Sequence, residues 1–271
     1  MQGVDYSFSR PDINCLWDKG YRFVIRYTSN GSSGKNASKA EIDALIRKGF
    51  KVGIVHQNGT SDMLEGYSKG VMDATSAKKK TEALGMPSDR PIFFPLDRDP
   101  EPLSNEQWTA CKRYLDGCAS VLGRNRVGVY GGYRAIEILC PTSAPWGWQT
   151  YAWSRGRISS KAHFRQYKNA VKLCGGEVDL NETYKPDFGQ WPIDKEGMPE
   201  LDATERKLLR DAEARTQWIM QFMRDGALDA MIEAKVKEAL REDSSTPRSV
   251  FRQKMRELAR LGAEDALRDS K

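Results

Sequence analysis

Histidine and paired cysteine are scarce in this sequence. Its 271 residues include only two histidines, His56 and His163, which stand far apart and outside any His-x-x-His pattern. A histidine-based metal site and a Ser-His-Asp triad are therefore poorly supported. The five cysteines are Cys15, Cys111, Cys118, Cys140 and Cys174. Because their number is odd and no Cys-x-x-Cys pair occurs, we expect buried reduced thiols rather than a disulfide framework or a zinc site.

Long hydrophobic runs are also missing. No window approaches eighteen apolar residues, so we expect no transmembrane helix and no membrane insertion. The first five residues, Met-Gln-Gly-Val-Asp, lack the charged and apolar regions of a classical secretion signal. We therefore expect a protein that stays in a cytoplasm until something else releases it. The formal net charge is +6 and no nucleic-acid-binding motif occurs, so we expect no nucleic-acid partner.

Short apolar strands alternate with helical segments over most of the chain. We predict eight strands, at 3–7, 21–29, 51–57, 91–97, 126–132, 146–154, 162–169 and 177–181. Helices are expected between most of them, with little helix between the last ones. This pattern predicts an α/β fold, a (β/α)8 TIM-like barrel with reduced last helices, over residues 1–195. A doubly wound open sheet is the alternative, although no Gly-x-Gly-x-x-Gly follows the first strand.

The predicted helix 39–48 has signals at both ends. Ser38 can cap it, because its hydroxyl can accept a hydrogen bond from a free N–H of the first turn. Glu41 stands three residues further on, as a capping box requires. Gly49 is placed where glycine commonly ends a helix. Longer helices are expected at 65–84 and 104–122.

The composition changes after about Pro199. Strand signals disappear, and Ala, Leu, Glu, Lys and Arg become frequent. Apolar residues recur near helical spacing, so we predict a separate α-helical C-terminal region over residues 196–271. Its apolar stripe, within residues 202–268, must be buried against something. Packing on the barrel, self-association into a homo-oligomer and a targeting module all remain open.

Four aspartates follow predicted strands at one mouth of the barrel. Asp97 and Asp99 end the apolar run that starts at Pro91, and their i, i+2 spacing puts both on one face of an extended chain. Asp5 ends the first strand and Asp179 the last, and these strands are neighbours in a closed barrel. Clustered carboxylates with separated pKa values supply the acid and the base of glycoside hydrolysis. We expect no metal and no cofactor, although the same cluster could hold Mg²⁺.

Aromatic and amide side chains accompany these aspartates. Aromatic rings suit the apolar faces of sugars, and amides suit hydroxyl and N-acetyl groups. The candidate substrate-binding residues are Tyr27, Gln57, Tyr130, Gln149, Trp153 and Gln166. A single ring is more often part of the core, but the gathering of several near predicted strand ends favours binding.

Seven motifs, in order along the chain, resemble one family. They are Gly-Val-Asp-Tyr-Ser at 3–7, Tyr-Arg-Phe-Val-Ile-Arg-Tyr at 21–27, Phe-Pro-Leu-Asp-Arg-Asp at 94–99, Val-Gly-Val-Tyr-Gly-Gly-Tyr at 127–133, Trp-Gln-Thr-Tyr-Ala-Trp-Ser at 148–154, Phe-Arg-Gln-Tyr at 164–167 and Val-Asp-Leu-Asn at 178–181. Together they resemble the glycoside-hydrolase-like domain of actinobacterial cell-envelope proteins and actinophage lysins. That domain is similar to the family-25 lysozymes, which are muramidases. The resemblance covers residues 2–192.

The resemblance implies roles for the four aspartates. Asp5, Asp97 and Asp179 match the three aspartates that end strands one, four and eight in family-25 lysozymes. Asp99 stands where that family has a glutamate as proton donor, and aspartate is one methylene shorter. A misplacement of about 1 Å can cost on the order of 100-fold in rate. The departure is compatible with a shifted backbone, a different substrate, or a domain that binds glycan without cutting it.

The leading prediction is a peptidoglycan-degrading glycoside hydrolase, a phage endolysin in which Asp99 protonates the leaving glycosidic oxygen. Asp5, Asp97 or Asp179 would stabilise positive charge, position an N-acetyl group or activate water. Such a lysin would lie in the host cytoplasm until a holin releases it to the cell wall. Two alternatives remain: a non-catalytic wall-binding or virion-associated domain, and a metal-dependent hydrolase.

Overall fold

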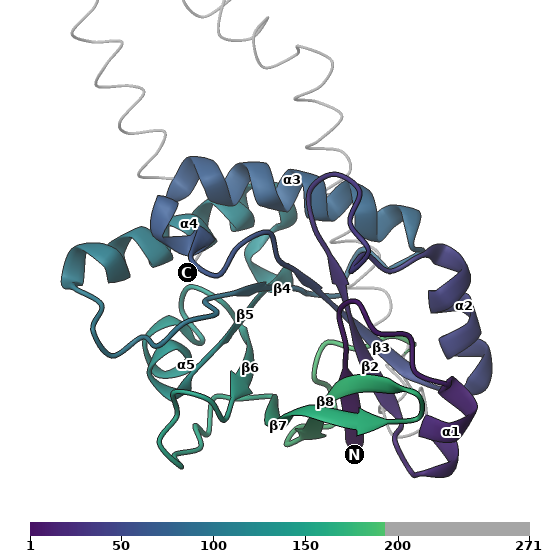
Figure 1. Ribbon diagram of the computed structural model, residues 1–271. Helices are drawn as coiled ribbons and strands as arrows, with labels where there is room; N and C mark the ends of the chain where they lie inside the picture. Colours follow the sequence, from purple (N-terminus) through teal and green to yellow (C-terminus); the bar gives the residue numbers. More distant parts are fainter. Residues whose placement is uncertain (193–271) are drawn as a thin grey trace, which may run out of the picture. The chain divides into compact units, whose positions relative to one another are not determined.

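The predicted strands form a closed barrel (Figure 1). The computed structural model describes residues 1–192. The strands are β1 Gln2–Asp5, β2 Phe23–Thr28, β3 Lys51–His56, β4 Ile92–Pro95, β5 Val127–Gly131, β6 Trp146–Thr150, β7 Phe164–Leu173 and β8 Gly176–Thr183. They pair in sequence order, and β8 closes the barrel on β1. The TIM-like barrel is confirmed and the open sheet is wrong. The C-terminal region 196–271 lies outside the described residues and stays a prediction, as does its boundary.

The last strand departs from a fully parallel barrel. Strands β1 to β7 run parallel to one another, whereas β8 is antiparallel to both β7 and β1. The expectation that Asp179 ends the last strand is therefore wrong, because this residue lies in the first half of β8. Asp179 still reaches the carboxyl end of β1, since it pairs with Asp5 in the β1–β8 ladder.

One helix follows each of the first five strands and lies on the outside of the barrel (Figure 1). These helices are α1 Ile13–Asp18, α2 Lys39–Lys48, α3 Tyr67–Ala83, α4 Asn105–Leu122 and α5 Tyr133–Leu139, with short 3₁₀ turns η1 Asp62–Glu65 and η2 Arg124–Arg126. The described chain has no helix after β6 or β7, so the expected reduction of the last helices is confirmed. No helix within residues 1–192 is long and apolar enough to cross a membrane.

Helix α2 begins and ends where the sequence predicts. The Ser38 hydroxyl accepts a hydrogen bond from the Glu41 N–H at 3.2 Å. Gly49 takes the left-handed conformation, with φ of 105°, and ends the helix. The Glu41 carboxylate, however, accepts from Nε of the buried Arg26 at 2.7 Å. The Glu41 side chain, which was expected to complete the capping box, therefore forms an ion pair with Arg26 instead.

Two apolar layers make up the core. One fills the barrel and consists mainly of aromatic side chains: Phe23, Ile25, Val55, Phe93, Tyr130, Trp148, Phe164 and Phe188. Trp148 and Phe164 stack with their ring centroids 5.2 Å apart. The other layer lies between the strands and the surrounding helices. The barrel interior is therefore a packed core that supports its mouth from below.

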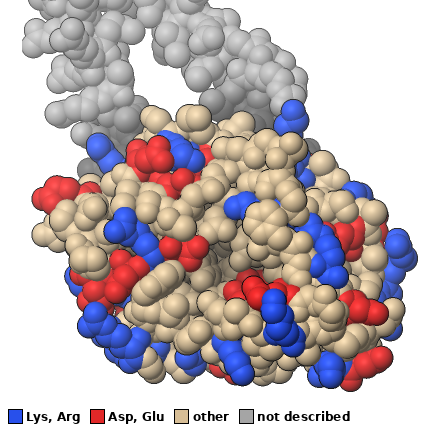
Figure 2. Space-filling view, in the orientation of Figure 1, with Lys and Arg blue, Asp and Glu red and all other residues tan. Residues whose placement is uncertain are grey.

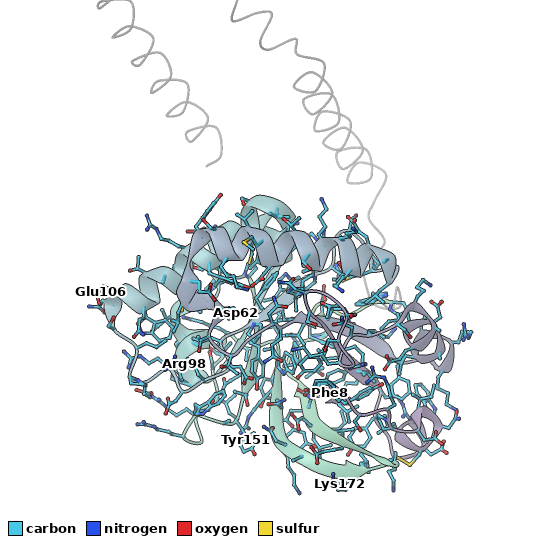
Figure 3. All side chains as sticks on the ribbon, turned by 45° about the horizontal axis from the view of Figure 1, so that its top comes forward. Phe8, Asp62, Arg98, Glu106, Tyr151 and Lys172 are labelled. Carbon is cyan, nitrogen blue, oxygen red and sulfur yellow. A yellow bond between two sulfur atoms is a disulfide. The ribbon has the colours of Figure 1, made fainter. Side chains whose placement is uncertain are left out.

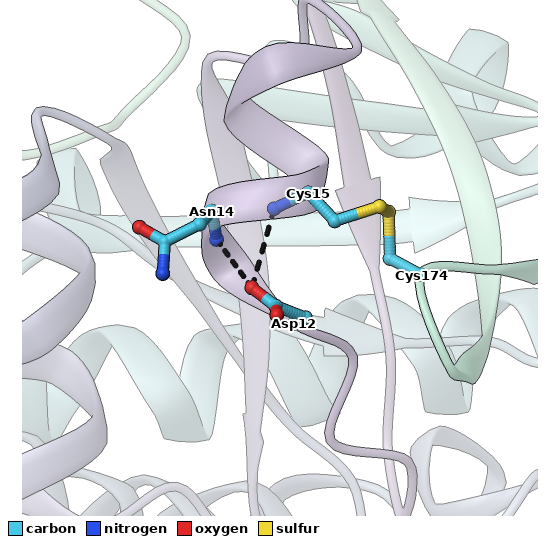
Figure 4. Close-up of a disulfide and its surroundings, with 4 residues drawn as sticks. All are labelled: Asp12, Asn14, Cys15 and Cys174. Carbon is cyan, nitrogen blue, oxygen red and sulfur yellow. Dashed lines mark hydrogen bonds between the residues drawn. A yellow bond between two sulfur atoms is a disulfide. The ribbon is translucent and has the colours of Figure 1, made fainter.

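A disulfide corrects the expectation for cysteine. Cys15 in α1 is bonded to Cys174 in the turn between β7 and β8 (Figure 4). These residues are 159 positions apart in sequence, and the antiparallel pairing of β8 with β1 brings them together. Asp12 caps α1 through the Asn14 and Cys15 N–H groups, at 2.7 and 3.2 Å, and its own N–H donates to the Cys174 carbonyl. The other three cysteines are free and buried, as predicted.

Candidate active site

A cavity of about 160 Å³ opens at the mouth of the barrel, on the side where strands β1 to β7 end. Its lining residues are Tyr27, Gln57, Pro95, Asp97, Tyr130, Trp148, Gln166, Asn169 and Asp179. The surface of the described part is hollowed near its centre and carries acidic and basic side chains around the hollow (Figure 2). Segments far apart in the sequence thus contribute carboxyl, amide and aromatic groups to one small space.

Gln166 joins two of the predicted catalytic carboxylates. Its amide nitrogen donates to Oδ2 of Asp5 at 2.9 Å and to Oδ2 of Asp179 at 3.0 Å. Its amide oxygen accepts from the Tyr130 hydroxyl and from Thr150 Oγ1, each at 2.9 Å. Both donors and both acceptor sites of this amide are in use, so its position is fixed.

Asp5 lies behind the cavity wall and is 1% exposed. Besides Gln166, the Tyr27 hydroxyl donates to its Oδ1 at 2.9 Å and the Asn181 amide to its Oδ2 at 2.7 Å. Burial raises the pKa of Asp5 from 3.8 to about 7, and the negative charge of Asp179 adds to this, against the effect of the three hydrogen bonds. Near neutral pH this buried carboxyl is therefore partly protonated.

The pKa values of the two carboxyl groups that line the cavity, Asp97 and Asp179, are also raised. Burial raises the pKa of Asp179, although the Ala170 N–H donates to its Oδ1 at 2.7 Å and lowers that pKa. Burial likewise raises the pKa of Asp97, while a hydrogen bond from Gln57 at 2.9 Å and the charge of Lys35 oppose the rise. Asp97 and Asp179 can thus hold a proton at higher pH than exposed aspartates do.

Asp99 is not among the residues that line the cavity. Its Oδ1 accepts a hydrogen bond from the Glu101 N–H at 3.0 Å, so this carboxylate stabilises the turn that follows β4. Glu101 is itself held by Arg134 and Arg157 at 3.1 and 3.2 Å. The expected shared face of Asp97 and Asp99 is wrong because β4 ends at Pro95, and the chain beyond it is not extended strand.

The predicted substrate-binding residues divide into two groups. Tyr27, Gln57, Tyr130 and Gln166 line the cavity, whereas Gln149 and Trp153 do not. Gln149 is wholly buried, and its amide bonds to Ser154 Oγ, the Arg157 carbonyl and the Ser159 N–H. It alternates with the inward-facing Trp148, so it points away from the barrel interior.

Residues that the sequence analysis did not propose complete the site. Asn181 donates to Asp5 and accepts from Trp148 Nε1 at 2.9 Å, and Asn169 lines the cavity. The Asp-Leu-Asn spacing already placed Asn181 on the same strand face as Asp179, so this residue could have been found from the alternation alone. Asn169 lies beside a register shift in β7, which the sequence does not reveal.

Residues 1–192 also form depressions away from this cavity. Among the described residues, no group of three or more His, Cys, Asp or Glu side chains could hold a metal ion. Two larger depressions, of about 600 and 530 Å³, lie between the starts of α3 and α4 and beside the β7–β8 turn. Neither is lined by any of the four predicted catalytic aspartates.

A closed barrel with three carboxylates gathered at its mouth defines a glycoside hydrolase-like protein. The chain belongs to the Rv2525c-like, glycoside hydrolase-like domain family, whose model matches residues 14–185. It is 32% identical over 202 residues to Rv2525c of Mycobacterium tuberculosis, covering 69% of this chain and 82% of that protein. That relative is provisionally designated a peptidoglycan hydrolase.

Solved structures agree with this assignment. A crystal structure of Rv2525c with L-tartrate, described as a Tat-secreted protein, matches with a TM-score of 0.65 and 30% identity over 70% of this chain and 98% of that one. An uncharacterised protein of B. stearothermophilus matches with a TM-score of 0.51 and 18% identity over 68% and 95% of the two chains. The second likeness shows the fold alone.

The expected location is wrong. The sequence led us to expect a host cytoplasm before holin-mediated release, whereas the relative Rv2525c is Tat-secreted, which points to export. The disulfide between Cys15 and Cys174 is consistent with an oxidising compartment. The phage endolysin assignment has no support among these relatives.

Proposed function

We propose that this protein is an exported glycoside hydrolase that acts on peptidoglycan. The observation that carries the proposal is the Gln166 amide, which joins Asp5 to Asp179 at a cavity that Asp97 also lines. Carboxyl groups with raised pKa values beside ionised ones are what general acid catalysis of glycoside cleavage needs. The designation of Rv2525c as a peptidoglycan hydrolase, at 32% identity, supports the choice of substrate.

Asp97 is the proposed proton donor. It lines the cavity, and its burial favours the protonated form that a general acid must have before reaction. Asp179, on the same cavity, would be the carboxylate that stabilises positive charge at the sugar or activates water. Asp5 does not reach the cavity, so its role is to share a proton and the Gln166 amide with Asp179.

Asp99 has a different role in this proposal from the one that the resemblance implies. Its carboxylate is engaged by the Glu101 N–H and does not line the cavity. We therefore assign it to the positioning of the loop after β4. That loop begins at Leu96 and contains Asp97, so its conformation determines where the proposed acid lies.

The cavity lining also suits recognition of a sugar. Tyr27 and Tyr130 offer ring surfaces, and the Gln57 amide lies beside Asp97 with a 2.9 Å hydrogen bond. A hydroxyl or N-acetyl group of the substrate would bond to these polar groups. The proposed substrate-binding residues are therefore Tyr27, Gln57 and Tyr130, whereas Gln166 holds Asp5 and Asp179 in place. Gln149 and Trp153 would support the loop after β6 rather than touch the sugar.

A non-catalytic glycan-binding domain is the second candidate. The observation in its favour is that Asp99, at the position of the family-25 proton donor, does not line the cavity. For the C-terminal region 196–271, self-association and wall targeting both remain proposals.

Digestion of purified peptidoglycan, followed by mass analysis of the fragments, tests the two candidates. The hydrolase should release fragments with new reducing ends, and Asp97→Asn should release none. If the wild-type protein sediments with cell walls but releases no fragment, the binding domain replaces the hydrolase. If it neither binds nor cuts peptidoglycan, both candidates are refuted.

A further inference from the structure

The cavity is small compared with the polymer on which the proposed hydrolase acts. Its volume of about 160 Å³ corresponds to about five water molecules at about 30 Å³ each. Sites for drug-sized ligands span about 300–1,000 Å³. The cavity can therefore admit about one sugar unit, and the neighbouring units of a glycan strand must lie on the surface around the mouth.

Two exposed aromatic rings lie on that surface. Phe8 is 68% exposed and follows β1, and Tyr151 is 39% exposed and follows β6. In the barrel order β6, β7, β8, β1 they stand on the two sides of the β7–β8 hairpin, which carries Gln166 and Asp179. Figure 3 shows Phe8 and Tyr151 on the same face of the barrel as Asp62 and Arg98. The rings thus flank the strands that bear the proposed chemistry.

The Tyr151 ring is carried by a rigid loop. The backbone N–H of Tyr151 donates to the carbonyl of Gln166 at 2.8 Å, which places this residue next to the cavity wall. The loop is fastened from beneath by the buried Gln149, whose amide bonds to Ser154, Arg157 and Ser159. An exposed ring on such a loop loses little conformational freedom when a ligand binds.

Backbone strain in the same loop supports this interpretation. Trp153 and Arg155 adopt left-handed conformations, with φ of 57° and 50°, although neither is glycine. Such conformations cost on the order of 1 kcal/mol or more each and concentrate at ligand-binding segments. The buried Ser154 between them donates to the Thr150 carbonyl and accepts from the Tyr133 N–H, so the strained turn is held in place.

The loop that carries Phe8 is held in a comparable way on the other side of the hairpin. Arg10 donates to the Ser7 carbonyl at 2.8 Å and to the Gly34 carbonyl at 2.9 Å, which ties the loop after β1 to the loop after β2. A Cβ atom at Gly34 would lie 3.4 Å from the Phe8 ring. The second loop also forms a bridge from Asn36 to Tyr27, which lines the cavity. Phe8 therefore belongs to a segment connected to the cavity wall.

We propose that Phe8 and Tyr151 form two outer sugar-binding positions, where each ring stacks on the apolar face of a hexose unit in an N-acetylated glycan strand. The proposal rests on the proposed function, which places a further unit of the same strand in the cavity. Separate rings with polar neighbours, Ser7 and Ser9 on one side and Arg155 on the other, suit a sugar chain. A protein partner would need a larger continuous apolar patch.

Binding of β-1,4-linked N-acetylglucosamine oligomers, from two to six units, tests the outer positions by calorimetry. The wild-type protein should bind the hexamer more tightly than the dimer. Phe8→Ala and Tyr151→Ala should each weaken hexamer binding by about 2- to 10-fold. A dimer with one unit in the cavity can reach only one of the two rings, so at most one of the two variants should weaken dimer binding. Phe8→Tyr and Tyr151→Phe keep the ring and should keep the affinity. Mass analysis after each titration verifies that the oligomers are intact.

Tyr184→Ala is the matched control. Tyr184 is 40% exposed, close to the exposure of Tyr151, but it follows β8 at the opposite end of the barrel. Its loss should leave binding of every oligomer unchanged. Equal wild-type affinity for dimer and hexamer, or alanine variants that bind the hexamer like wild type, would overturn the outer positions alone. Failure of the wild-type protein to bind any oligomer would overturn the proposed glycan function with them.

Discussion

Asp5 and Asp179 lie directly opposite each other in the antiparallel ladder between β1 and β8. Side chains opposite each other in such a ladder share a face and have Cβ atoms about 4.5–5.5 Å apart. Two carboxylates at this spacing repel each other when both are ionised, and the Gln166 amide between them relieves only part of that repulsion. The pair therefore favours a state with one proton, and the antiparallel direction of β8 is what creates it.

The pH dependence of stability should reveal this proton. The pKa of Asp5 is raised to about 7 in the folded protein, from 3.8. Its stabilising contribution is thus fully present below about pH 4 and lost as the pH rises through about 7. Relative to Asp5→Asn, the wild-type protein should lose about 2–3 kcal/mol of unfolding free energy between pH 5 and pH 8. Chemical denaturation at both pH values measures this difference.

Comparison with the variant is needed because other groups titrate in this range. Burial lowers the pKa values of His56 and His163 to about 4, so their contribution has the opposite sign. It is the same in both proteins and cancels in the difference. Asparagine at position 5 can still accept from Gln166 and Asn181 through its oxygen. A difference that stays constant from pH 5 to pH 8 would show that Asp5 carries no proton in the folded state.

Gln166 should be important for stability as well as for catalysis. Gln166→Leu removes the partner of four groups, and it leaves the buried Tyr130 and Thr150 hydroxyls without their acceptor. Each unsatisfied buried group costs about 1–3 kcal/mol, so we expect a total loss of about 3 kcal/mol or more. Tyr130→Phe removes one of these bonds and should cost about 1 kcal/mol. Equal losses for the two variants would contradict the central role of the amide.

The disulfide should stabilise the barrel substantially. It connects α1 to the turn of the hairpin that carries Asp179, and it closes a loop with a sequence separation of 159 residues. We expect reduction, or Cys15→Ser, to lower the unfolding free energy by about 2–5 kcal/mol. Denaturant titration with and without reductant measures the loss. Reductant should have no effect on Cys15→Ser; an effect there would have to arise from another residue.

The barrel could be predicted from the sequence because the signals that mark its strands and helices lie within a few residues of each other. Strand ends such as Asp5, and caps such as Ser38 and Gly49, follow from alternation and turn chemistry within a few residues. The direction of β8 is not local, because the pattern that marks a strand is the same whichever way the strand runs. The position of Asp179 within its strand and the Cys15–Cys174 pairing therefore escaped the sequence analysis.

The site was predicted in part for the same reason. Residues on regular strands, such as Tyr27, Tyr130 and Gln166, reach the cavity as alternation requires. Asp99 and Trp153 lie on irregular loops, where hydrogen bonds such as that from the Glu101 N–H to Asp99 decide which way a side chain points. Those bonds depend on the folded chain and cannot be read from spacing.

Asparagine substitutions distinguish the role of Asp97 from that of Asp99. Asp97→Asn should lower the rate of peptidoglycan cleavage by about 10²- to 10⁴-fold, because an amide cannot donate the catalytic proton. Asp99→Asn should stay within about threefold of wild type, because the new side-chain oxygen can still accept from the Glu101 N–H. Rates are measured from the release of reducing ends, with glycan binding as the control for folding.

An aryl glycoside with a good leaving group distinguishes loss of an acid from loss of a charge. Such a substrate needs little protonation, so Asp97→Asn should recover most of its activity on it, whereas Asp179→Asn should remain impaired because it loses charge stabilisation. Recovery by Asp99→Asn, together with a large loss on peptidoglycan, would instead make Asp99 the proton donor. The loop after β4 would then have to rearrange when substrate binds, since the Asp99 carboxylate is bonded to the Glu101 N–H in the structure described.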